Sequence, residues 1–193
     1  MFYLSKIEHK FALPPHLLAR PIREAIQSEL ERLFLDKVIQ KLGLCISVYD
    51  ITSIEGGSIF PGAGAPTYQV VFNLIMFRPF PGEIISAKVM SLDADGVRLS
   101  LGFFEDIYIP THHMPYPSYY ISKNNTRKWT WEYGEETDEF NIEISNEVIR
   151  FQVLSVSYPT IPVEQAKESK PFAPMVVNGS LYHEGLGPVS WWQ

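Results

Sequence analysis

The stretch FRPFPGEI, residues 77–84, separates two regions of the chain whose residue patterns differ. Each proline in it restricts the residue before it to extended conformations, and the glycine permits a backbone geometry that other residues avoid. Because its two phenylalanines are too apolar to lie in water, we expect a packed, semi-rigid junction between two domains rather than a flexible linker. The residues assigned to this junction are Phe77, Arg78, Pro79, Phe80, Pro81 and Gly82.

The region before the junction combines strand-like segments with one helical pattern. Apolar residues recur every three to four positions from Ile22 to Val38, which predicts an amphipathic helix that ends near Gly43. β-Branched and aromatic residues predict strands on both sides of this helix. These strands cover residues 2–13, 43–54 and 68–77. We therefore predict an α+β domain over residues 1–80, a small sheet with one helix on one face.

A glycine-rich segment, GGSIFPGAGAP at residues 56–66, lies between two of these predicted strands. It lacks the Gly-Lys-Ser/Thr ending of a phosphate-binding loop, and no helix follows it to hold an anion. Its glycines permit the positive φ angles of a turn. In such a loop we expect Ile59 and Phe60 to be exposed and available to a partner. The segment is therefore predicted to be an interaction loop.

The region after the junction has a different residue pattern, without a helical segment of comparable length. Short strand-like segments follow one another at spacings of about 8 to 12 residues, joined by tight polar turns such as DADG at residues 93–96. This pattern predicts an all-β barrel of the OB type over residues 81–193. Two segments rich in proline and polar residues, near 111–128 and 159–174, are predicted to be insertions.

Charge divides unevenly between the two regions. Residues 1–80 hold 8 Lys or Arg against 7 Asp or Glu, whereas residues 81–193 hold 8 against 15. An acidic second region argues against strong nonspecific binding to nucleic acid, which depends on basic residues that neutralise phosphates. Any such binding is expected to be local and weak.

One local pattern nevertheless suits single-stranded RNA, because it interleaves basic with aromatic residues. The residues of this predicted RNA-binding set are Lys123, Arg127, Lys128, Trp129 and Trp131. The two tryptophans share one face of a strand, so a purely structural role in the barrel core or between the domains is the alternative. A freestanding RNA-binding protein with an OB barrel is the corresponding alternative function.

The sequence carries no recognisable catalytic or cofactor-binding motif, and its one set of candidate metal ligands has a simpler explanation. Hydrolase, kinase and dinucleotide-binding motifs are not recognisable, and Cys45 is the only cysteine. The acidic residues Asp93, Asp95, Glu105 and Asp106 offer one set of candidate metal ligands. DADG is more typical of a hairpin turn, however, and we predict a protein without enzymatic activity.

No segment indicates membrane insertion or secretion. The charged start MFYLSKIEHK does not have the order of a signal peptide, and no apolar run reaches the roughly 18 residues of a membrane span. A cytosolic or nuclear location is expected.

The combination of segments resembles one protein family. FRPFPGE, preceded by the glycine-rich loop and followed by the OB-like series, is similar to the larger stalk subunit of eukaryotic and archaeal RNA polymerases. Within that family, four segments most resemble the RNA polymerase III member. They are GLCISVYDI at 43–51, SLGFFEDIYIP at 100–110, WTWEY at 129–133 and LGPVSWW at 186–192.

The resemblance implies a noncatalytic subunit that supports transcription initiation in the nucleus. Its N-terminal tip domain would dock on the polymerase core, and its OB domain would project near nascent RNA. The expected partners are a small helical stalk subunit, core subunits of RNA polymerase III and initiation factors. By the same resemblance, the residues expected to dock on the core are Ile59, Phe60, Pro61, Gly62 and Gly64.

Overall fold

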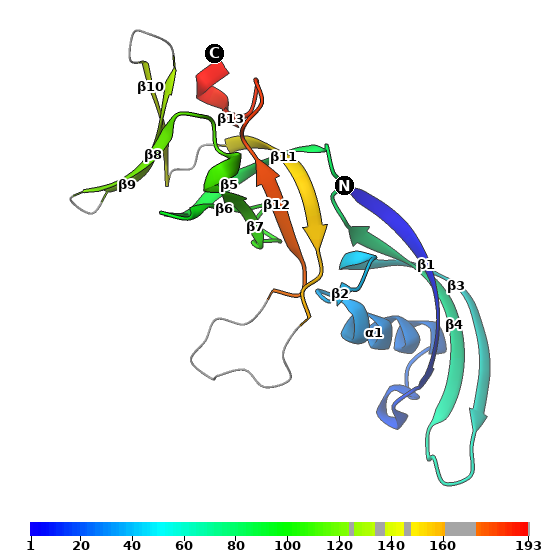
Figure 1. Cartoon of the computed structure of the whole chain (residues 1–193). Coiled ribbons are helices and arrows are strands. Elements are labelled where there is room, and N and C mark those ends of the chain that lie inside the picture. Colours follow the sequence, from blue (N-terminus) through cyan, green and yellow to red (C-terminus); the bar gives the residue numbers. More distant parts are fainter. Residues whose placement is uncertain (124–125, 134–137, 145–147, 161–172, 193) are drawn as a thin grey trace. The chain divides into compact units, whose positions relative to one another are not determined.

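The structure is a computed structural model, and it describes residues 1–123, 126–133, 138–144, 148–160 and 173–192. The chain divides into two compact units, Met1–Arg78 and Pro79–Gln193. In Figure 1 the first unit runs from blue to green-cyan and the second from green to red. Among the described residues, no helix is long and apolar enough to cross a membrane.

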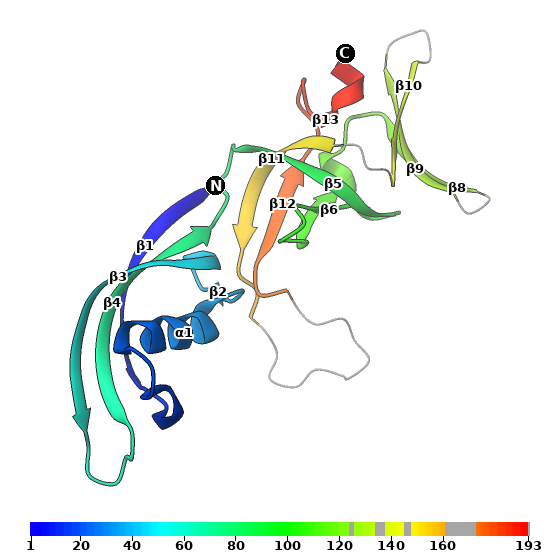
Figure 2. The same ribbon diagram turned by 180° about the vertical axis from the view of Figure 1, so that it is seen from behind.

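The first unit is a four-stranded antiparallel sheet that carries one α-helix on one face (Figures 1 and 2). The strand order is β1-β4-β3-β2. Its elements are β1 (Phe2–Ala12), η1 (Pro15–Leu17), α1 (Ile22–Phe34), β2 (Val38–Ile39), β3 (Gly43–Ile59) and β4 (Pro66–Phe77). This arrangement confirms the predicted small sheet with a single helix.

The core of this unit forms where the apolar stripe of α1 meets the inner face of the sheet. Ala25, Ile26 and Leu30 of the helix are fully buried, as are Phe72 and Leu74 of β4. Alternate residues of a strand face opposite sides, so β4 supplies every second residue to this core. The sheet therefore has one apolar face under the helix and a second face without a helix on it.

Helix α1 ends at Phe34, well before the predicted end near Gly43. Leu35 adopts an extended backbone (ψ 136°), and Asp36 has a positive φ of 56°. The Asp36 N–H then donates to the Cys45 carbonyl at 3.0 Å, and the chain enters β2. Pairing with β3 thus ends the helix although the apolar spacing continues, because tertiary contacts override a local pattern.

Strands β3 and β4 form a long hairpin that incorporates part of the predicted loop. Gly56 and Gly57 lie inside β3 with φ angles of 98° and 93°, and the register shifts between Gly56 and Ser58. A Cβ on Gly56 would lie 2.8 Å from the Thr67 carbonyl oxygen. The glycines therefore make a bulge in a continuous strand, and only residues 60–65 connect β3 to β4.

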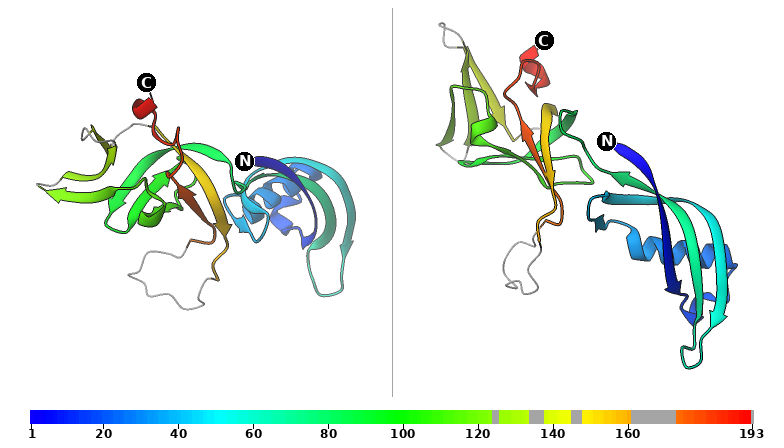
Figure 3. Two further views of the ribbon diagram at one scale, coloured as in Figure 1. Left: turned by 45° about the horizontal axis from the view of Figure 1, so that its top comes forward. Right: turned by 45° about the vertical axis from the view of Figure 1, so that its right-hand side comes forward.

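The second unit contains a closed five-stranded barrel. Its strands are β5 (Ile84–Asp93), β6 (Gly96–Ser100), β7 (Ile107–Pro110), β11 (Val148–Ser157) and β12 (Val176–Ser180). The order β12-β7-β6-β5-β11 is closed by pairing of β12 with β11, and β12 runs parallel to β7. In both views of Figure 3, β11 (yellow) and β12 (orange) run side by side. The topology is that of an OB fold, as predicted.

Inward residues of every barrel strand fill the barrel core. Val89, Leu99, Ile109 and Phe151 are buried, with exposures between 0% and 7%. A Cβ on Gly179 of β12 would lie 2.6 Å from the Phe151 ring, so this glycine makes room for the ring.

The described residues between β7 and β11 include a second sheet. This sheet has the order β10-β9-β8 and is antiparallel. Its strands are β8 (Ser118–Lys123), β9 (Thr126–Tyr133) and β10 (Asp138–Glu143), and η2 (Thr111–His113) precedes them. The segment near 111–128, predicted to be an insertion, lies between two barrel strands in the sequence and carries η2, β8 and the start of β9.

Two further segments of this unit were singled out from the sequence, WTWEY and the segment near 159–174. The segment WTWEY lies in β9 of the added sheet, outside the five barrel strands. The predicted insertion near 159–174 falls largely on residues 161–172, outside the described part of the chain.

Backbone hydrogen bonds hold both ends of the junction. The Arg78 N–H donates to the Met1 carbonyl at 2.9 Å within the first unit, and the Gly82 N–H donates to the Val153 carbonyl at 2.7 Å within the second. Phe77 is fully buried, as expected, but Phe80 is 57% exposed. Backbone hydrogen bonds anchor the turn at Phe80, and packing of its ring at the junction remains a prediction.

Candidate functional site

The tip of the β3–β4 hairpin presents the loop residues predicted to dock on a partner (Figure 1). Ile59 and Phe60 are 63% and 53% exposed, and the neighbouring Pro61, Gly62 and Gly64 are exposed as well. Exposed side chains of this size are unfavourable in water, so such a tip favours burial against another surface. All five residues predicted for docking lie together here.

Two features define the shape and charge of this tip. Gly62 and Gly64 have φ angles of 82° and 65°, yet a Cβ on either would meet nothing within 4 Å. They serve the backbone turn rather than a close approach. The Lys10 ammonium lies 5.7 Å from the centre of the Phe60 ring, which places a positive charge beside the apolar tip.

The structure removes Trp129 from the predicted RNA-binding set. Its side chain is only 5% exposed, and its Nε1–H donates to the Asp93 carbonyl at 3.1 Å. Its ring also packs against Tyr120, with 5.7 Å between ring centres. Trp129 anchors the added sheet to the end of barrel strand β5, so it cannot stack on a base in this conformation.

The other members of that set do not form one surface. Strand alternation puts Arg127, which is exposed, on the same face as Trp131, whereas the half-buried Lys128 lies on the opposite face. The side chain of Lys123 lies outside the described residues. Trp131 belongs to an aromatic cluster described below. RNA contact by this set remains a prediction for the three described residues other than Trp129.

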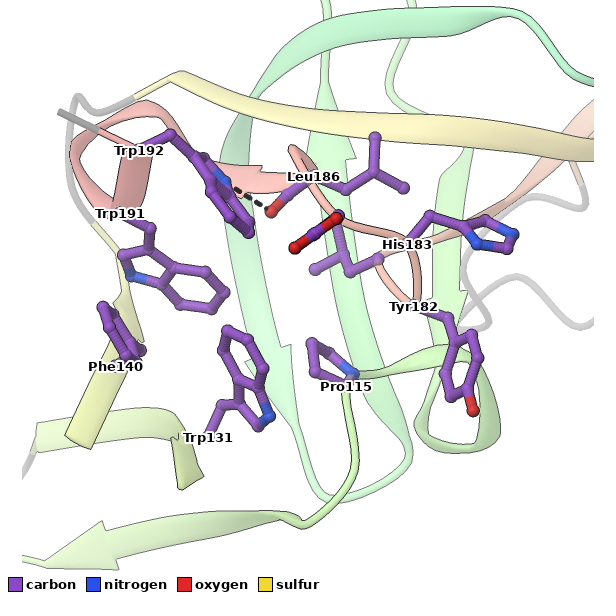
Figure 4. Close-up of a pocket in the computed structure, with 10 residues that line it drawn as sticks. Pro115, Trp131, Phe140, Tyr182, His183, Leu186, Trp191 and Trp192 are labelled. Carbon is purple, nitrogen blue, oxygen red and sulfur yellow. Dashed lines mark hydrogen bonds between the residues drawn. The ribbon is translucent and has the colours of Figure 1, made fainter. Parts of the chain in front are cut away.

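An aromatic cavity of about 360 Å³ lies between the added sheet and the C-terminal segment (Figure 4). Rings from β9, from β10 and from η3 (Val189–Trp192) line it. These ring-bearing residues are Trp131, Phe140, Trp191 and Trp192. This cavity was not predicted from the sequence, although the tandem tryptophans Trp191 and Trp192 are plain in it.

The outer face of the barrel offers a second basic and aromatic surface that sequence reasoning missed. Arg98 of β6 pairs with Tyr108 of β7, and Tyr108 pairs with Asn178 of β12. Arg98 is exposed and Tyr108 half-buried. The strand alternation in VRLS and DIYI carried the only available signal for this surface. In OB folds the face of the second and third strands commonly binds oligonucleotides.

Acidic neighbours modify this barrel face. The Tyr108 hydroxyl donates to the Asp95 carbonyl at 2.7 Å. Burial raises the pKa of Tyr108, the Asp95 carboxylate raises it further, and the Arg98 guanidinium opposes both effects. Asp93 and Asp95 flank the hairpin turn between β5 and β6, as the DADG pattern predicted. Their carboxylates repel phosphates, so they disfavour strong binding of nucleic acid at this face.

The acidic residues named as metal ligands do not form a metal site. Within the described ranges, no group of three or more His, Cys, Asp or Glu residues could hold a metal ion. Asp93 and Asp95 belong to the β5–β6 turn, whereas Glu105 and Asp106 immediately precede β7.

Comparison with known proteins matches both units to families. The model for "RNA polymerase III subunit Rpc25" matches residues 83–192, and that for the "SHS2 domain found in N terminus of Rpb7p/Rpc25p/MJ0397" matches residues 8–64. DNA-directed RNA polymerase III subunit RPC8 of Bos taurus is 35% identical over the whole of this chain and 98% of its own length. The subunit rpc8 of Schizosaccharomyces pombe is 34% identical, with both chains fully covered.

A relative from another polymerase is more distant. DNA-directed RNA polymerase II subunit RPB7 of Saccharomyces cerevisiae is 25% identical, over 60% of this chain and 68% of its own length.

Proposed function

Since the chain belongs to the RNA polymerase III subunit Rpc25 family, we propose that it acts as the larger stalk subunit of the polymerase in the nucleus. In this role it has no catalytic activity of its own. It docks through its first unit on the polymerase core, pairs with a small helical stalk subunit and supports transcription initiation. The barrel provides a weak contact for nascent RNA.

The observation that carries this proposal is that the two units follow one another along the chain in the order of the two family models. The chain also covers nearly the full length of its relatives. A tip unit with an exposed apolar hairpin precedes an OB barrel, and the two family models match them in that order. Docking requires an apolar, desolvated centre on the bound surface. Ile59 and Phe60 are the exposed apolar residues that suit this centre.

The uncovered face of the first sheet supports the binding of a small partner. Phe2 and Leu4 of β1 are 48% and 54% exposed, and Leu4 pairs with the half-buried Ile75 of β4. Further along the same face, the Lys6 and Glu8 positions are polar. An apolar area at one end of a sheet face suits the apolar side of a partner helix.

Leu4→Asp is expected to prevent pairing with the small stalk subunit. The substitution places a carboxylate in an interface that excludes water, and it leaves folding intact because Leu4 is 54% exposed. The measurement is co-purification of the co-expressed subunits by size-exclusion chromatography. Lys6→Ala, on the same face, serves as the control and should leave the heterodimer intact. Equal recovery with Leu4→Asp would contradict this assignment.

Arg98→Ala is expected to weaken binding of single-stranded RNA by the heterodimer about threefold to tenfold and to reduce the salt slope by about one. The slope falls because one cation no longer displaces a counterion. Salt-titrated fluorescence anisotropy with oligouridine measures both quantities. Arg20→Ala in the first unit is the charge-matched control.

The outcome of the RNA titration also separates the alternative function. A freestanding RNA-binding protein would bind oligouridine tightly without partners, with a steep salt dependence. If Arg127→Ala and Lys128→Ala weaken binding and Arg98→Ala does not, the set predicted from sequence is the contact surface instead.

The whole proposal is tested by purifying the tagged full-length chain from nuclei. The expected result is co-purification of RNA polymerase III core subunits and of a small stalk subunit in stoichiometric amounts. A chain recovered as a monomer, with no affinity for either, would overturn the proposal.

A further inference from the structure

The walls of the aromatic cavity come from segments far apart in the sequence. The rings of Trp131, Phe140 and Trp191 form a triangle, with centres 5.4 to 5.5 Å apart in every pair. Figure 4 shows these rings together on one side of the cavity, with Trp192 beside them. Three strongly apolar rings thus meet at one place instead of dispersing into separate cores.

The backbone holds these rings in position. Gly187 has a φ of 100°, and a Cβ there would lie 2.7 Å from the Trp191 ring, so this ring lies directly over the glycine. The Trp192 Nε1–H donates to the Leu186 carbonyl at 2.8 Å, which is the dashed line in Figure 4. The walls are therefore ordered before any ligand arrives, which reduces the entropy lost on binding.

The cavity is open to a partner. Trp192 is 39% exposed and Tyr182, on the rim, is 63% exposed. The volume of about 360 Å³ is large enough for one long side chain and too small for a folded element.

The charges around the cavity favour a cation. Glu184 and His183 are among the ten lining residues, and none of these ten is a lysine or an arginine, so the permanent charge of the lining is negative. The faces of aromatic rings also carry partial negative charge, which attracts cations. A nucleotide would bring its phosphate close to the Glu184 carboxylate, with no lysine or arginine among the ten lining residues to neutralise it, which disfavours nucleic acid in this cavity.

We propose that this cavity is an aromatic cage that binds an arginine side chain of a partner polypeptide. A guanidinium group is planar and weakly hydrated, so it can stack on a tryptophan face while its N–H groups pair with a carboxylate such as that of Glu184. A lysine ammonium is more strongly hydrated and cannot stack in this way. The cage is an additional protein-binding surface on the barrel unit, separate from the hairpin tip and from the uncovered face of the first sheet.

The test uses the full-length chain and a short glycine-serine peptide with one central arginine. Binding is followed through the indole N–H resonances of the tryptophans in NMR titrations. The matched probe contains citrulline, which has the shape of arginine without its charge, and a third peptide contains lysine. We expect saturable shifts at Trp131, Trp191 and Trp192, with at least tenfold weaker binding of citrulline and several-fold weaker binding of lysine.

Two variants locate the site. Glu184→Gln, at an exposed position, should weaken the arginine peptide about fivefold or more without disturbing the fold, whereas Glu105→Gln, an exposed carboxylate that does not line the cavity, should not. Gly187→Ala should displace the Trp191 ring and abolish the shifts.

The proposal is overturned if citrulline binds as tightly as arginine, if Glu184→Gln has no effect, or if the shifts do not involve the cage tryptophans. It is equally overturned if oligouridine produces the same shifts and displaces the peptide. These measurements need no polymerase, so their failure would leave the proposed stalk function standing.

Discussion

Trp129→Ala is expected to lower the free energy of unfolding of the second unit by about 3–5 kcal/mol, the range for truncation of a large buried aromatic side chain. Trp129 is 5% exposed and joins the added sheet to the barrel through its ring and its hydrogen bond to the Asp93 carbonyl. Its loss leaves a cavity and removes the hydrogen bond to the Asp93 carbonyl at the same place. Urea denaturation followed by tryptophan fluorescence and far-ultraviolet circular dichroism measures the change.

Two further variants separate the ring from the hydrogen bond. Trp129→Phe retains most of the apolar bulk and should cost less, because it removes the indole donor and part of the ring. Arg127→Ala, an exposed position on the same strand, should change the stability by no more than about 0.5 kcal/mol. If Trp129→Ala were as mild as Arg127→Ala, the anchoring role of Trp129 would be wrong.

The double variant Ile59→Ala, Phe60→Ala is expected to weaken docking on the polymerase core by about 2–4 kcal/mol, on the order of 30-fold or more in affinity. Both side chains are more than half exposed in the free chain, so their truncation removes interface burial without opening a cavity in the core. The dissociation constant of the purified heterodimer for stalk-depleted polymerase, measured by biolayer interferometry, gives the change.

The control for the docking variant is Tyr49→Ala. Tyr49 lies on the same strand as Ile59 and is 62% exposed, but it is outside the hairpin tip. It should leave the affinity nearly unchanged. If the two variants weakened docking equally, the contact would extend along β3; if neither did, the tip would not be the docking surface.

The sequence predicted the OB barrel because alternation and turn residues are local signals. The DADG turn and the alternation in VRLS each depend on only a few neighbouring residues. The end of α1 could not be predicted in the same way. It depends on a hydrogen bond from Asp36 to the Cys45 carbonyl, which exists only after β3 has folded against the segment.

The candidate sites show the same difference. The exposed hairpin tip was predictable because glycines and apolar residues stand together between two strand patterns. The different environments of Trp129 and Trp131 were not, since both lie on the same face of β9 and differ only in the distant segments they meet. The aromatic cavity forms only because η3 packs against β9 and β10. The spacing of strands along the sequence does not predict this tertiary contact.

Strand β12 is the last barrel strand in the sequence, and it closes the barrel, which has a consequence for synthesis of the chain. All four strands of the first unit precede Arg78, so that unit can fold while the ribosome is still adding the barrel. The barrel cannot close until Val176–Ser180 has emerged, because this strand pairs with both β7 and β11. Until then the two strand edges are unpaired and prone to aggregate. We therefore expect premature stop codons before Val176 to yield a folded first unit attached to an insoluble remainder, a substrate for chaperones and proteases.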